Sequence, residues 1–153
     1  MRALIIRTRV TLIALLAVAA AASATAASVS TAAAASPAPV SIQATVTQGF
    51  SGVWQASGAI SDSGSFARTD VHLTGSFFNS PTVGAFQAVF AFSGSQGTFN
   101  VRDELVASTS GVNGNWQIVS GTDAYDGISG HGTSSFDFST STVTFTGVIS
   151  KTG

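Results

Sequence analysis

Residues 120–132 read SGTDAYDGISGHG, and their residue types are set more clearly by backbone geometry than those of any other stretch. Four glycines surround one aromatic residue, Tyr125, and two carboxylates, Asp123 and Asp126, lie close by. Sequence typical of β-strands precedes and follows this segment. We therefore expect residues 121–132 to turn the chain between two strands.

From Val40 onward, apolar and polar residues alternate with a period of two, which is the pattern of half-buried strands. Short segments rich in glycine, serine and asparagine separate the alternating runs, and no run has a helical period. The expected strands cover residues 40–47, 53–60, 66–78, 86–94, 98–108, 115–120, 133–138 and 142–150. Residues 61–64 (SDSG) are expected to form a turn.

Eight consecutive antiparallel strands, each with one apolar face, can close into an up-and-down barrel, which removes the exposed sheet edges. The sequence therefore predicts an all-β, eight-stranded antiparallel barrel of the allene-oxide-cyclase or calycin type, with a β-sandwich as the alternative. The absence of a long crossover and the glycines within strands (Gly58, Gly75, Gly147) favour the barrel. An interior of this size is either filled by side chains or holds one small ligand.

The N-terminus has the layout of a secretory signal peptide over residues 1–27. Three arginines precede a short apolar run, and small residues that offer cleavage sites between 24 and 35 follow it. The run is too short for a membrane anchor, which needs about 20 apolar residues. Residues 28–39 are expected to be a flexible lead-in rich in alanine, serine and proline, and residues 40–153 a single barrel domain that is secreted.

Charge and composition limit the kinds of binding partner that we expect. Three of the six basic residues lie in the signal segment, so three basic and seven acidic residues follow it, a formal charge of −4. Nucleic acid and anionic membrane surfaces both require a basic face, so we expect neither as a partner once the signal is removed. The lack of cysteine excludes a thiol nucleophile, a thiolate metal site and thiol redox chemistry.

Residues 120–132 resemble the glycine-rich segment of the allene oxide cyclase and dirigent protein superfamily. In that family a glycine-glycine-threonine-glycine-x-aromatic segment lies between two barrel strands. Here Gly121-Thr122-Asp123-Ala124-Tyr125 stands in that layout, with Ser120 and Asp123 in place of two glycines. Aspartate tolerates left-handed backbone better than most residues. The chain is also similar to small secreted bacterial proteins of unassigned role with this barrel. The resemblance implies a barrel with an apolar cavity that is often a homo-oligomer, and it assigns no catalytic residue.

Asp103 is the weak candidate for a catalytic residue, because it shares a strand face with Phe99, Val101 and Leu105, which should point inward. A carboxylate there is costly unless it is paired, and burial would raise its pKa, as a pocket acid or base requires. Alternatively, a β-bulge turns Asp103 to solvent, or backbone amides near the barrel mouth donate to it.

Other ionisable groups are less informative. One strand face is expected to carry Arg68, Asp70 and His72, and the opposite face Ala67, Thr69, Val71 and Leu73. The charged row is either a polar pocket wall or the solvent side of the strand. Two histidines, His72 and His131, without metal-ligand spacing predict no metal site and no cofactor.

Aromatic residues form the core or line a cavity, and the sequence does not separate these two roles. The candidate ligand-binding residues are Phe86, Phe90, Phe92, Phe99, Trp116, Tyr125 and Phe145. For Tyr125, packing under the glycine-rich turn is the alternative to a hydroxyl at the barrel mouth.

Three hypotheses remain. The first is a secreted barrel that binds a small apolar ligand. The second is a cofactor-free isomerase or a stereochemistry-directing protein. The third is a packed structural or surface-associated module without a ligand. No nucleophile elbow, phosphate loop or dinucleotide fingerprint occurs, which favours a non-catalytic role without excluding an enzyme.

Overall fold

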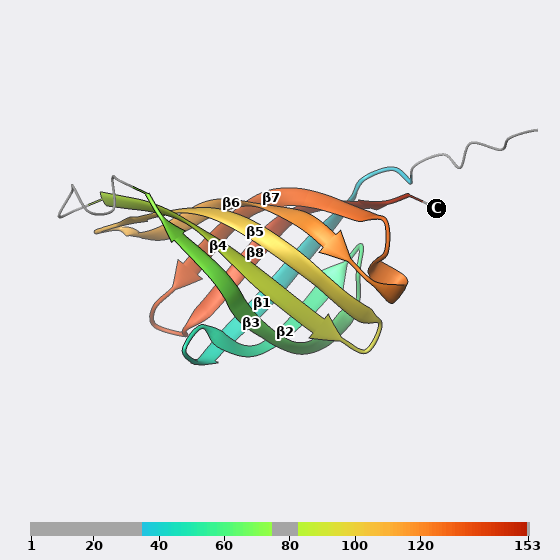
Figure 1. Cartoon of the computed structure of the whole chain (residues 1–153), viewed down its shortest axis with the longest axis horizontal. Coiled ribbons are helices and arrows are strands. Elements are labelled where there is room, and N and C mark those ends of the chain that lie inside the picture. The colour runs from blue at the N-terminus through green and yellow to red at the C-terminus, as the bar shows by residue number, and fades with distance from the viewer. Residues whose placement is uncertain (1–34, 75–82, 153) are drawn as a thin grey trace, which may run out of the picture. The chain divides into compact units, whose positions relative to one another are not determined.

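The computed structural model describes residues 35–74 and 83–152, which form one closed antiparallel barrel with the strands in sequence order (Figure 1). The predicted up-and-down barrel is confirmed, and the sandwich alternative is wrong. The closing pair is β1 with β8, in register from Ala38 opposite Ile149 to Thr45 opposite Thr142. The strands are β1 (Ala38–Gln48), β2 (Ser51–Gly58), β3 (Asp62–Leu73), β4 (Val83–Gly94), β5 (Gly97–Ser108), β6 (Gly111–Gly121), β7 (Ile128–Asp137) and β8 (Thr142–Lys151).

The predicted signal peptide, residues 1–27, lies outside the described residues, as does most of the predicted lead-in over residues 28–39. Strand β1 begins at Ala38, two residues before the expected start of the barrel. Before it, the backbone amide of Ala35 donates to the carbonyl of Lys151 at 3.1 Å. Phe77 and Phe78, the expected end of the third strand, also lie outside the described residues.

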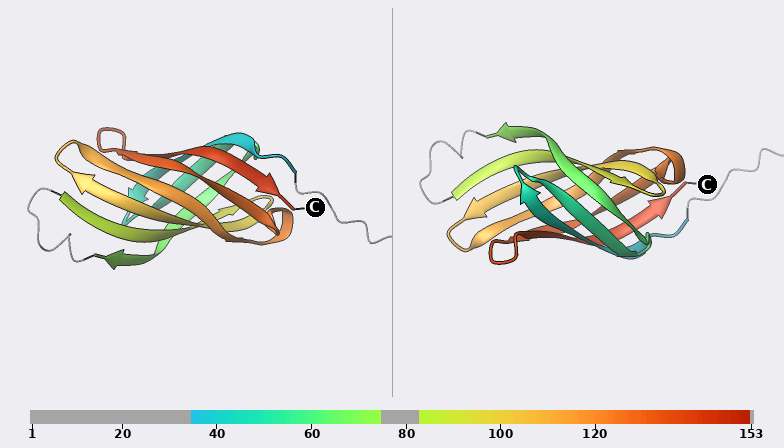
Figure 2. Two further views of the ribbon diagram at one scale, coloured as in Figure 1. Left: turned by 90° about the horizontal axis from the view of Figure 1, so that it is seen from above. Right: turned by 90° about the horizontal axis from the view of Figure 1, so that it is seen from below.

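Because the strands alternate in direction, their connections fall at two opposite ends of the barrel (Figure 2). One end holds the connections β2–β3, β4–β5 and β6–β7, together with the start of β1 and the end of β8. The other end holds the connections β1–β2, β5–β6 and β7–β8. We call the first the plugged end and the second the open end, for reasons given by their side chains.

Aromatic rings fill the plugged half of the interior. The Phe92 and Phe99 rings stack with centroids 4.9 Å apart, and the Phe99 and Tyr125 rings form an edge-to-face pair with centroids 5.0 Å apart. Trp54 packs edge-on against both phenylalanines, and its indole nitrogen donates to the carbonyl of Ser93 at 3.1 Å. Such pairs add about 0.5–1.5 kcal/mol each beyond the burial of their area. The plugged end is therefore a packed core.

The connection between β6 and β7 is shorter than predicted. Strand β6 runs to Gly121 and β7 begins at Ile128, so residues 128–132 are strand and only residues 122–127 turn the chain. The turn contains a single 3₁₀ turn, η1 (Asp123–Tyr125). Asp123 has φ = +55°, in the left-handed region that aspartate tolerates better than most residues. No helix in the described residues is long and apolar enough to cross a membrane.

Tyr125 lies beneath this turn and is almost completely buried. Of the two roles that the sequence left open, its ring therefore packs under the turn. Its hydroxyl donates to Oδ2 of Asp62 at 2.7 Å. Oδ1 of Asp62 accepts from the Ser95 hydroxyl and from the Ser63 amide, each at 2.8 Å. Burial alone would raise the pKa of Asp62, but these hydrogen bonds outweigh it and hold the pKa well below its ordinary value of 3.8.

Asp62 was expected in a turn over residues 61–64, yet it is the first residue of β3. The side chain explains the difference, because its bonds to Ser95 and Tyr125 hold it against two other connections. The turn-favouring residues at 61–64 reflect local propensity alone, and the long-range hydrogen bonds of Asp62 override that propensity here.

The expected faces of the third strand are wrong because of a β-bulge. Arg68 pairs with Phe90 and Asp70 with Val89, which leaves Thr69 as the extra residue. The bulge reverses the alternation, so Arg68 lines the interior while Asp70 is exposed. The row of charged residues is thus divided between the two faces of the sheet.

We expect the change Tyr125→Phe to lower the free energy of unfolding by about 1–2 kcal/mol, because it removes a hydrogen bond to a charged group and leaves the ring in place. Urea denaturation of the two proteins measures this. The control Ser150→Ala removes an exposed hydroxyl that bonds Ser129, and should change stability by less than about 0.5 kcal/mol. Equal effects of the two changes would contradict a structural role for the Tyr125 hydroxyl.

Candidate functional site

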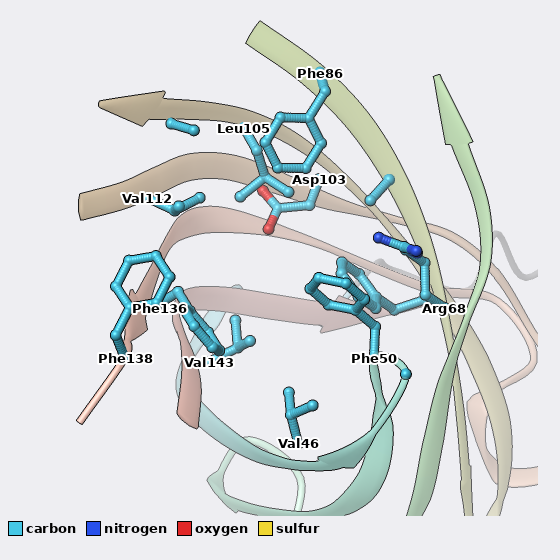
Figure 3. A pocket seen from close by; sticks show the side chains of 14 residues that line it. Val46, Phe50, Arg68, Phe86, Asp103, Leu105, Val112, Phe136, Phe138 and Val143 are labelled. Carbon is cyan, nitrogen blue, oxygen red and sulfur yellow. The ribbon is translucent and has the colours of Figure 1, made fainter. Parts of the chain in front are cut away.

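The open half of the barrel encloses an apolar cavity of about 440 Å³ (Figure 3). This volume lies within the range of roughly 300–1,000 Å³ that small-molecule sites occupy. Successive side chains of a strand point alternately to the interior and the exterior of the barrel, and the inward-facing ones form the wall of the cavity. The main apolar lining residues are Phe86, Phe90, Leu105, Val112, Phe136 and Val143.

Asp103 of β5 lines this cavity and has no exposed surface, so of the orientations that the sequence left open it takes the inward one, and no bulge turns it to solvent. In the sheet it lies between Ala88 of β4 and Trp116 of β6. Oδ1 accepts a hydrogen bond from the Ser134 hydroxyl at 2.9 Å. Oδ2 is buried without a hydrogen-bond partner. Figure 3 shows the carboxylate among the apolar side chains of the wall.

A glycine makes the Asp103–Ser134 contact possible across an intervening strand. Gly114 of β6 pairs with Leu105 of β5 and with Ser134 of β7, so it lies between the two polar side chains. A Cβ at position 114 would lie only 2.5 Å from Oδ1 of Asp103 and 2.7 Å from the Ser134 hydroxyl oxygen. Any side chain there would displace the pair, so Gly114 provides the space for it.

Burial in this apolar wall raises the pKa of Asp103 from 3.8 to about 6. The Ser134 hydrogen bond lowers it and the nearby charge of Glu104 raises it, both with smaller effect. The carboxyl group therefore changes its charge close to neutral pH. Groups with this property are suited to proton transfer or to ligand pairing.

Arg68 is the other charged residue of the cavity wall, and it approaches from β3. Its guanidinium carbon lies 4.0 Å from the centroid of the Phe50 ring, a cation–π contact. Phe50 and Phe138 belong to the turns of the open end and are 46% and 66% exposed. The mouth of the cavity is thus rimmed by aromatic side chains.

The predicted ligand-binding residues divide between the two halves of the barrel. Phe86 and Phe90 line the cavity together with Asp103. The other predicted residues are buried in or beside the aromatic core and do not belong to the cavity wall: Phe92, Phe99, Trp116, Tyr125 and Phe145. The indole nitrogen of Trp116 donates to the carbonyl of Thr133 at 3.0 Å, which anchors its ring in the core.

Sequence reasoning missed Gly114, Ser134 and Phe50. Ser134 stood out in no motif, although it shares a face with Phe136, which was a usable signal for an inward serine. Phe50 lies between the first two expected strands, and nothing local indicated that this connection reaches over the interior.

The histidines take no part in this site, since His72 and His131 are both exposed. Among the described residues, no three histidine, cysteine, aspartate or glutamate side chains gather as a metal ion would require.

The fold and cavity define a small closed β-barrel with an apolar interior site. A family model described as "Protein of unknown function (DUF3224)" matches residues 18–146, most of the chain, so the chain belongs to the DUF3224 family. No curated protein and no solved structure matches the chain.

We expect the change Ser134→Ala to raise the pKa of Asp103 further, by about 1 pH unit, because the ionised carboxylate loses its one hydrogen bond. An NMR titration of the Asp103 side-chain carboxyl carbon measures this. The neighbouring Ser135 is exposed, so Ser135→Ala serves as the control and should leave the titration unchanged. A pKa that stays the same in the Ser134→Ala protein would contradict the assigned role of the hydroxyl.

Proposed function

We propose that this protein binds a small apolar molecule inside the barrel. The observation that carries the proposal is the cavity of about 440 Å³, walled by apolar side chains and rimmed by exposed Phe50 and Phe138. Burial of apolar ligand surface in such a wall is worth about 25 cal/mol per Å². A module packed solid with side chains, the third hypothesis, does not account for this space.

The aromatic core supports the same proposal. It closes the plugged end with stacked and edge-on rings, so the open half is held in shape without a ligand. A pre-formed cavity avoids the cost of ordering its walls when the ligand enters. Asp103, which is held by its hydrogen bond from Ser134, supplies a polar group that can orient a ligand in an otherwise largely apolar wall.

A cofactor-free isomerase or a stereochemistry-directing protein, the activities implied by the allene oxide cyclase and dirigent resemblance, is the second candidate. It is favoured by Asp103, whose pKa of about 6 suits a general acid or base near neutral pH. The two candidates differ in the response to Asp103→Asn. If the protein is an enzyme, this variant should lose turnover but still bind its ligand. If it is a binding protein, the variant should change only the affinity for the ligand or the preference among ligand head groups.

The location that we propose is outside the cell, because a basic start, a short apolar run and small residues form the signal-like segment 1–27. Intact mass measurement of the protein recovered from the culture medium should find the chain beginning between residues 25 and 36. Recovery of the full-length chain from cells alone would contradict this.

Ligand binding is tested by filling the cavity. Ala107 lines it, while the adjacent Val106 is 46% exposed on the outer face. We expect Ala107→Phe to weaken the binding of propylbenzene at least about tenfold, because the added ring takes up space that the ligand needs. NMR shifts of the Leu105 and Val143 methyl groups report the binding.

The matched control is Val106→Phe, which adds the same ring outside the barrel and should leave the affinity unchanged. Absence of propylbenzene binding to the wild-type protein, or equal loss in both variants, would overturn the proposal.

A further inference from the structure

We infer that the ligand is an apolar amine, with its protonated nitrogen bound to Oδ2 of Asp103 and its apolar body in the cavity. The inference rests on the proposed function and adds the chemical class of the ligand. It starts from an unsatisfied acceptor, since Oδ2 has no hydrogen-bond partner although the residue is fully buried. Buried polar atoms are nearly always hydrogen-bonded, so an unpaired one calls for a reason.

The niche around Asp103 satisfies one oxygen and leaves the other free. Ser134 donates to Oδ1, and the missing side chain of Gly114 makes this contact possible. Oδ2 has no hydrogen-bond partner, and Figure 3 shows the Asp103 carboxyl group near Phe86 and Leu105, with the Arg68 side chain also reaching into the cavity. A carboxylate kept only for stability would have both oxygens bonded, as Asp62 does at the plugged end.

The negative charge of the Asp103 carboxylate determines which ligand group it binds most strongly. An isolated buried carboxylate is costly, and a cation offsets its charge, whereas a neutral hydroxyl supplies only a hydrogen bond. Charge-assisted hydrogen bonds are about twice as strong as neutral ones. The ionised form of Asp103 therefore favours an ammonium group over an alcohol of the same shape.

The charged groups around Asp103 agree with this choice. From β3, Arg68 lines the cavity, but its guanidinium stacks on Phe50. From β5 itself, Glu104 is exposed on the outer face and adds negative potential. The residues that β4, β6, β7 and β8 present to the cavity wall carry no ionisable side chain. An anionic ligand would instead have to place its charge at Arg68.

Four probes with a common phenethyl body test the inference: propylbenzene, phenethyl alcohol, phenethylamine and hydrocinnamate. At pH 7.5 we expect phenethylamine to bind at least about tenfold more tightly than propylbenzene or the alcohol, since one charge-assisted bond is worth about 1.5–3 kcal/mol. Calorimetry or NMR titration of the full mature chain gives the affinities. In the Asp103→Asn protein, phenethylamine should bind no more tightly than phenethyl alcohol, because the carboxylate that distinguishes the two probes is gone.

The pH profile of the wild-type protein is a second measurement that needs no variant. Because burial raises the pKa of Asp103 to about 6, its carboxylate is mostly ionised from about pH 7 upward and is lost as the pH falls through 6. Amine affinity should therefore fall about tenfold per pH unit below 6, while propylbenzene affinity stays constant. The control Asp70→Asn removes an exposed carboxylate of β3 that does not contribute to the shift of Asp103 and should leave the amine preference intact.

The outcomes separate the two proposals. Propylbenzene binding without any preference for the amine overturns the inference and leaves the proposed function standing. A preference for hydrocinnamate places the head group at Arg68 and also overturns it. Failure of all four probes to bind overturns both.

Discussion

The hydrogen bond from Tyr125 to Asp62 holds the plugged end of the barrel together. It joins η1, which links β6 to β7, to the first residue of β3, while Ser95 brings the β4–β5 connection to the same carboxylate. Three connections that are distant in sequence thus meet at one side chain. The Tyr125 ring also completes the aromatic core against Phe99. Because the chain seals this end with its own side chains, the remaining space in the barrel lies at the other end.

The open half has the opposite construction. Its rim consists of exposed aromatic residues, and its interior has a polar pair where packed rings would otherwise be. Gly114 lies on β6 and faces the interior of the barrel. Because it has no side chain, Asp103 and Ser134 can meet from the two flanking strands. The space that this glycine leaves is filled by the polar pair, so that Asp103 can be accommodated in the wall of the cavity.

The period-two pattern was sufficient to predict the barrel and the number of strands, since these depend on alternation alone, whereas it left open whether Asp103 faces the interior or solvent. It failed where a single residue changed the register, as at Thr69, because a bulge leaves no clear trace in an alternating sequence. It also could not identify which aromatic residues border space. Phe90 and Phe92 are two residues apart on one face, yet the cavity wall includes only the first. That difference depends on ring packing between strands, which no local pattern contains.

The two inward carboxylates show how one residue type can serve opposite ends of a barrel. Asp62 accepts hydrogen bonds from Tyr125, Ser95 and backbone amides, so its pKa falls and its charge strengthens the fold at neutral pH. Asp103 accepts one bond in an apolar wall, so its pKa rises to about 6, and its charge costs stability as the pH rises from 3.8 through 6. A ligand that supplies a cation to Oδ2 would recover this cost. The fold thus retains at Asp103 a charge that is unfavourable in the absence of a cation, and the Ser134 hydroxyl and the space at Gly114 hold this carboxylate in the wall of the cavity.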